Sequence, residues 1–254
     1  ISCTLCHQIL SDNLGTDASF SGGYAIENIA EIYGPYQYPA AQPMINVSGY
    51  TPVFSDHVNG SELCATCHTL FTPYVDNDGQ VAGYFPEQTP YLEWKNSNYP
   101  ASNTDCQSCH MPAVNQKMKI STRPPMLSNL RSPIWKHDFA GGNIFMVSLI
   151  KNNSDEINVT ASPEHFDTTI SKTKNMLQEK AINLDASANI IHDSLNVEIT
   201  VENLCGHKFP TGFPSRRAWL ETMVIDEQSD TIFHSGKWDE TGKIQGLNYR
   251  LEPH

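Results

Sequence analysis

Three cysteine–histidine motifs with the same spacing lie in the first half of the sequence. Each has the form C-x-x-C-H, and the residues are Cys3, Cys6 and His7; Cys64, Cys67 and His68; and Cys106, Cys109 and His110. In such a motif the two thiols form thioether bonds to the vinyl groups of a haem, and the adjacent histidine binds the iron as the proximal ligand. The sequence therefore predicts three covalently attached c-type haems.

Other uses of paired cysteines explain these motifs less well. Disulfides are common in exported proteins, but they do not account for the histidine that follows every pair. A zinc site would need a second C-x-x-C or an H-x3-5-H at matched spacing, and a thioredoxin-like site would need one motif in an α/β chain. Of the seven cysteines only Cys205 lies outside the motifs. We expect it to be a buried free thiol, with an intersubunit disulfide as the alternative.

Seven further histidines could supply a second axial ligand to the irons. His137 lies in "WKHDFAGGN", where Trp135 and Phe139 could flank a haem and the glycine pair would permit close approach. His207 lies in "GHKFPTGFP", a Gly- and Pro-rich turn between two expected strands. His57 stands in a polar loop before the second motif, and His254 ends the chain. These four are the candidate distal ligands.

The remaining candidates for an axial position are weaker. His165, His192 and His234 fall on expected surface positions near a helix or strands. Met118 or Met126 as an axial ligand would raise the reduction potential of a haem, but methionine more often fills a core. We therefore expect bis-histidine ligation, with distal ligands drawn from the four candidates above.

Composition limits the partners and the compartment. The chain has 254 residues and a net charge of −12, which disfavours nucleic acid and anionic membrane surfaces as partners. It contains no apolar run long enough for a membrane span. It lacks an initiator methionine and a signal peptide, so we expect a processed or partial chain. Because c-type haems are attached outside the cytoplasm, we expect a periplasmic or extracellular protein.

The sequence suggests two regions of different composition. Residues 1–150 hold all three motifs and are rich in loops, with helices expected at 89–97 and 142–150. Residues 151–254 are expected to hold one amphipathic helix and several strands. The helix is expected at 162–181 and the strands at 195–201, 218–225 and 231–235. The expected fold is a mostly irregular and α-helical, haem-packed domain followed by an antiparallel, β-sandwich-like domain that is incomplete at its C-terminus.

Several stretches resemble a family of large multihaem c-type cytochromes from bacteria and archaea. They are "ISCTLCHQI", "SELCATCHTLF", "FPEQTPYLEW", "CQSCHMP", "HDFAGGN" and "GHKFPTGFPSRRAWLE". The resemblance implies that chains of haems relay electrons, that His137 and His207 belong to haem-binding motifs, and that the chain is incomplete at both ends. Some members of that family polymerise into extracellular filaments. Cys205 stands where relatives usually have no cysteine.

The expected function is electron transfer. Iron with two histidine ligands has no open position for a substrate, so we expect electron exchange with redox proteins or with copies of the same chain in a homopolymer. The alternative is a haem enzyme of the nitrite-reductase or hydroxylamine-oxidising kind, which needs one iron with a vacant face. A third interpretation gives the chain a mainly structural role as a filament subunit.

Overall fold

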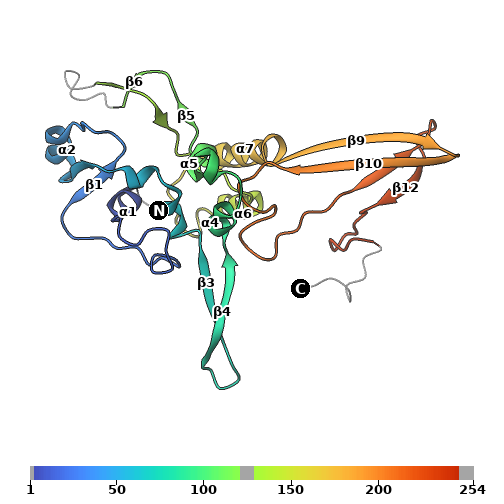
Figure 1. Cartoon of the computed structure of the whole chain (residues 1–254), viewed down its shortest axis with the longest axis horizontal. Helices are drawn as coiled ribbons and strands as arrows, with labels where there is room; N and C mark the ends of the chain where they lie inside the picture. The colour runs from blue at the N-terminus through green and yellow to red at the C-terminus, as the bar shows by residue number, and fades with distance from the viewer. Residues whose placement is uncertain (1–2, 121–128, 246–254) are drawn as a thin grey trace. The chain divides into compact units, whose positions relative to one another are not determined.

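The computed structural model describes residues 3–120 and 129–245 (Figure 1). The chain divides into two compact units, Ile1–Pro214 and Ser215–His254. The expected domain boundary at residue 150 lies inside the first unit, and the assignment of two domains on either side of it stays a prediction. No helix among the described residues is long and apolar enough to cross a membrane.

The helices of the described residues are mostly short. Three of them, α1, α3 and α5, carry cysteines of the three motifs. The α-helices are α1 (Cys3–Gln8), α2 (Ala41–Ser48), α3 (Ser61–Ala65), α4 (Pro90–Lys95), α5 (Cys106–His110), α6 (Ile144–Asn152) and α7 (Pro163–Glu179). The described residues also form two short 3-10 helices, η1 (Asp56–Asn59) and η2 (Pro100–Ser102).

The strands of the described residues form six two-stranded sheets, of which β1–β2 is parallel and the others are antiparallel. The strand order gives the pairs β1–β2, β3–β4, β5–β8, β6–β7, β9–β10 and β11–β12. Their bounds are β1 (Glu31–Gly34), β2 (Thr51–Phe54), β3 (Leu70–Val75), β4 (Val81–Gln88), β5 (Ala113–Val114), β6 (Met118–Lys119), β7 (Leu130–Arg131), β8 (Ile134–Trp135), β9 (Ile182–Ile191), β10 (Ser194–Asn203), β11 (Thr222–Ile225) and β12 (Thr231–Ser235). The expected β-sandwich-like arrangement of the later strands stays a prediction.

Most of the elements expected from periodicity are present. The strand expected at 231–235 is β12, but the strand expected at 218–225 begins only at Thr222, as β11. Helix α7 lies within the range expected at 162–181. Helix α4 lies within the range expected at 89–97, and α6 overlaps the range expected at 142–150. Pro163 opens α7, as expected for a residue without a backbone N–H, but the Ser162 side chain makes no capping hydrogen bond to the helix. Strand β10 covers the alternating stretch 195–201.

Strands β9 and β10 pair over ten consecutive positions and form an amphipathic hairpin, which we call the β9–β10 ribbon (Figure 1). Leu195 is opposite Ile190 and Val201 is opposite Leu184, so their side chains share one face. These four side chains and Val197 are all exposed. Backbone hydrogen bonds between the strands therefore hold this ribbon together, with little contribution from side-chain burial.

The buried core of the first unit is small. One cluster consists of Phe20, Ala65, Tyr91 and Trp94, with partly buried aliphatic and aromatic side chains around it. The other buried apolar residues of this unit are Ile9, Ala140 and Ala181. The ring of Tyr91 stacks on Trp94 at 5.6 Å between centroids. This cluster joins the loop after the first motif, the helix of the second motif and α4. Such a small core suits a protein in which a bound cofactor supplies additional apolar surface.

Candidate haem sites

Each motif places its two cysteines one helical turn apart. In a helix, residues three positions apart lie on the same side, so both thiols can reach one edge of a porphyrin. Helices α1 and α5 cover their motifs, and in the second motif the His68 backbone N–H donates to the Cys64 carbonyl at 2.9 Å, which continues the turn after α3. All seven cysteines lie in the described part of the chain and are free thiols, as thioether formation requires.

Two proximal histidines each face a second histidine at nearly the same distance. The ring centroids of His7 and His137 are 6.2 Å apart, and those of His110 and His207 are 6.3 Å apart. Two metal–nitrogen bonds of about 2 Å plus two ring radii add to about 6 Å. The separation of both pairs therefore leaves space for one iron between the rings.

The four paired histidines share one pattern of hydrogen bonding, in which Nδ1 lies close to a backbone carbonyl oxygen. A carbonyl only accepts, so Nδ1 carries the proton and Nε2 keeps the lone pair that binds a metal. The carbonyls are those of Tyr33 for His7 (2.6 Å), Ala140 for His110 (2.8 Å), Trp135 for His137 (3.1 Å) and Lys208 for His207 (2.9 Å). Burial also lowers the pKa of His110, which favours the neutral, metal-binding form.

The segment 133–140 contacts two of the motifs. His137 of this segment faces His7, while the carbonyl of Ala140 accepts the hydrogen bond from His110. The segment is fixed beside the third motif, because the Phe139 N–H donates to the His110 carbonyl at 2.9 Å and β8 pairs with β5. A displacement of this segment would thus affect the histidine pairs of the first and third motifs together.

A carboxylate holds the loop that carries His207. One oxygen, Glu93 Oε2, accepts hydrogen bonds from the Lys208 backbone N–H at 2.9 Å and from the Thr211 hydroxyl at 2.7 Å. Glu93 belongs to α4, more than 110 residues earlier in the chain, so the bonds bring two distant segments together. The part of the loop that follows His207 is therefore anchored to α4.

Aromatic side chains from the same region shape the other end of that loop. The Tyr99 hydroxyl donates to the Leu204 carbonyl at 2.6 Å. A Cβ atom on Gly206 would lie 3.1 Å from Cδ1 of Trp94 and 3.5 Å from the Tyr99 ring. The absence of a side chain at Gly206 thus permits the loop to pack against these rings and to bring His207 to His110.

The second and third motifs lie next to each other. The Ser61 hydroxyl, at the start of α3, accepts from the Cys106 N–H at 3.0 Å, and the Gln107 amide donates to the Gly60 carbonyl at 2.8 Å. The Cys64 and Cys106 thiols also share a hydrogen bond, which lowers the pKa of Cys106 to about 7. Cysteines of the second and third motifs therefore lie side by side.

His57, a candidate distal ligand, is engaged elsewhere. Its Nε2 donates to the Ile9 carbonyl at 2.8 Å, and its Nδ1 accepts from the Ser55 hydroxyl at 2.6 Å. Neither nitrogen has a lone pair left for a metal in this arrangement. The ring links η1 to the end of the first motif, and burial lowers its pKa.

The described residues bring no other candidate to a position opposite a motif histidine. His254 and Met126 lie outside the described residues. Within the described residues, His68 is exposed and forms no ring pair like those of His7 and His110, although it lies near His110. Exposed positions, as expected, are found for His165 and His192, while His234 Nε2 pairs with Glu221 at 2.8 Å. Met118 is exposed in β6, and the half-buried Cys205 thiol donates weakly to the Ala181 carbonyl at 3.5 Å.

Sequence reasoning did not find the groups that position the histidines. Glu93, Tyr99 and the carbonyl of Tyr33 have no motif of their own. One signal in the sequence could have pointed to Glu93. It lies within "FPEQTPYLEW", one of the stretches that resemble multihaem cytochromes, but the resemblance gave this stretch no role.

Comparisons with known proteins give one informative likeness. No family model and no curated protein matches the chain. Among solved structures, a penta-heme cytochrome c552 from Thermochromatium tepidum is similar, with a TM-score of 0.55 and 15% sequence identity over 96% of this chain. The chain spans 58% of the length of that protein. The described chain thus has a fold similar to that of a multihaem cytochrome c.

Proposed function

We propose that the chain is an electron-transfer protein that holds three haem c groups on its C-x-x-C-H motifs. The observation that supports this most strongly is the pair of histidine–histidine separations, 6.2 and 6.3 Å, with every Nδ1 bound to a carbonyl. Haem c supplies reversible one-electron exchange at its iron. The likeness in fold to a penta-heme cytochrome agrees with this assignment.

In this proposal His7 and His137 bind one iron, and His110 and His207 bind another. Nitrogen ligands on both sides leave no position for a substrate, so these two centres exchange electrons without bond chemistry. The carbonyls of Tyr33 and Ala140 hold the proximal rings in the tautomer that binds iron. Glu93 holds the loop of His207 in place.

The iron of the haem on the second motif needs a sixth ligand that the two histidine pairs do not supply. We propose that its sixth ligand comes from outside the described residues, either from His254 or from a histidine of another copy in a homopolymer. The alternative, a haem enzyme of the nitrite-reductase or hydroxylamine-oxidising kind, would use this same iron, because His68 is exposed and faces no other histidine among the described residues. The expected location outside the cytoplasm, periplasmic or extracellular, applies to either function.

The test is the ligand state of each iron in the purified holoprotein. We expect three haems per chain by the pyridine haemochrome assay and low-spin ferric signals in electron paramagnetic resonance. A high-spin haem that binds cyanide tightly and disappears in a Cys64→Ser/Cys67→Ser variant would support the enzyme. Light scattering at several dilutions distinguishes ligation by His254 in a monomer from ligation between copies.

A further inference from the structure

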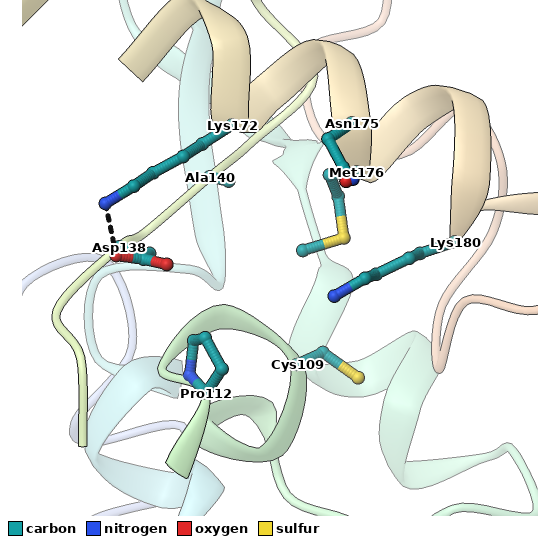
Figure 2. A pocket seen from close by; sticks show the side chains of 8 residues that line it. All are labelled: Cys109, Pro112, Asp138, Ala140, Lys172, Asn175, Met176 and Lys180. Carbon is teal, nitrogen blue, oxygen red and sulfur yellow. Dashed lines mark hydrogen bonds and ion pairs between the residues drawn. The ribbon is translucent and has the colours of Figure 1, made fainter. Parts of the chain in front are cut away.

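A hollow between α5, residues 138–140 and α7 places basic side chains beside the third motif (Figure 2). Cys109 lines this hollow together with Lys172, Met176 and Lys180 of α7 and the segment after it. Lys172 is ion-paired with Asp138, so its charge is largely compensated. Among the described residues Lys180 has no carboxylate partner.

Figure 2 shows that the ammonium of Lys180 and the sulfur of Cys109 line the same hollow. Cys109 is one of the two attachment atoms for the haem of the third motif. A positive charge at that edge therefore acts on the haem itself.

The chain segment that holds the other two motifs carries the opposite charge. Residues 1–94, which include the first and second motifs, contain ten Asp and Glu residues and no Lys or Arg, whereas residues 95–254 contain 18 acidic and 16 basic residues. One of these carboxylates, Glu31, accepts a hydrogen bond from the Tyr33 hydroxyl at 3.4 Å. The carbonyl of Tyr33 holds His7, so this negative charge lies beside the first motif.

From this asymmetry we infer that the haem on Cys106 and Cys109 has the highest reduction potential of the three, and that Lys180 contributes to it. The inference rests on the proposed function. Reduction adds one electron to the iron and lowers the charge of the haem, so a nearby cation favours the reduced form and carboxylates favour the oxidised form. Asp105 and Glu93 also lie near the third motif and oppose Lys180. Arg131, 5.1 Å from the centroid of the Tyr36 ring, opposes the carboxylates near the first motif, but residues 1–94 contain no Lys or Arg of their own.

The consequence is a direction for electron flow within the chain. An electron supplied by a low-potential reductant to the first or second motif would move to the third motif. The donor is oxidised by one electron, and the haem at Cys106 and Cys109 is reduced by one. The third motif would then be the exit towards an acceptor.

A spectroelectrochemical titration of the holoprotein and its variants tests the inference. In Lys180→Gln we expect the midpoint potential of the highest-potential haem to fall by about 28 mV. For one electron, this is a roughly threefold decrease in the equilibrium constant for reduction. The other two components should not move. Lys174→Gln, an exposed lysine on α7 that does not line the hollow, is the matched control and should change nothing. Unchanged potentials in Lys180→Gln would overturn the role of Lys180.

The assignment of the component needs its own variants. Loss of the highest-potential component in Cys106→Ser/Cys109→Ser would support the inference, and its persistence would overturn it. Should that protein not fold, His207→Met changes an axial ligand of the same haem, and the highest-potential component should be the one that moves. A wild-type protein with fewer than three haems would contradict the proposed function instead, so the two failures can be distinguished.

Discussion

The β9–β10 ribbon and the histidine sites of the first unit are held by different kinds of bond. In the ribbon, ten consecutive residues of each strand pair through the backbone without a shift in register. In the sites, His137 and His207 bond to nearby carbonyls, but other bonds join distant parts of the sequence. His7 and Tyr33 are 26 residues apart, and Glu93 and Lys208 are 115 residues apart. Local pairing thus builds the ribbon, whereas the sites also need long-range contacts.

The largest expected effect comes from removal of a haem attachment. In Cys106→Ser/Cys109→Ser we expect the haem content to fall from three per chain to two, because the motif has no other covalent anchor. The segment 133–140 should then lose protection from amide hydrogen exchange, while the β9–β10 ribbon keeps it. Equal loss in both regions would show that the ribbon also depends on the haem.

The next largest effect separates the proposed ligands from His57. His137→Ala and His207→Ala should each convert one haem from low spin to high spin, measured by electron paramagnetic resonance. His57→Ala should leave the spin states unchanged, because both nitrogens of His57 already take part in hydrogen bonds. A high-spin signal in His57→Ala would contradict the proposed ligand set.

The contribution of long-range anchoring is measured at Glu93. Glu93→Ala removes the acceptor of two hydrogen bonds, and we expect a loss of about 2 kcal/mol in the free energy of unfolding. The affinity for added cyanide at the His207 haem should increase, because the ligand loop is less restrained. Glu179→Ala, at the end of α7, is the control and should change neither quantity.

A smaller effect should appear in the pH dependence of stability. Burial lowers the pKa of His57 from its usual value of 6.5, so the unfolded chain binds the proton more readily than the folded one. Stability should therefore decrease as the pH falls from 6.5 towards the lower folded pKa. Denaturant titrations of His57→Gln should show a weaker decrease over that interval. An identical slope would mean that His57 does not contribute.

The smallest effect is expected on the exposed side of α7. Lys151 and Asp167 form an ion pair in which the Asp167 side chain is largely exposed. Such pairs contribute about 0.5 kcal/mol or less, since water screens the charges. Thermal unfolding of Asp167→Asn should differ little from wild type, and a large loss would show that α6 and α7 depend on this contact.

The two regions also differed in what the sequence could predict. The three motifs and the alternation in 195–201 follow directly from residue order. Strand β9 was not expected, because Ala186 and Ala188 weaken its apolar alternation. From the sequence, His137, His207 and His57 were all candidate distal ligands. The sequence could not show that both nitrogens of His57 are engaged, because this depends on which carbonyls and hydroxyls contact each ring. Those partners are fixed by tertiary contacts such as that of Ile9 with His57.

The cation-free first 94 residues have a consequence for how the protein can be dissected. Trypsin cleaves after lysine and arginine, and the first such residue is Lys95, which is exposed at the end of α4. Complete digestion of the denatured holoprotein should therefore leave residues 1–95 uncut, in one peptide that ends at Lys95 and carries the haems of the first and second motifs. The next fragment, 96–117, should carry the third haem alone. Mass spectrometry of these two coloured peptides would count the haems on each side of the charge boundary without any mutation.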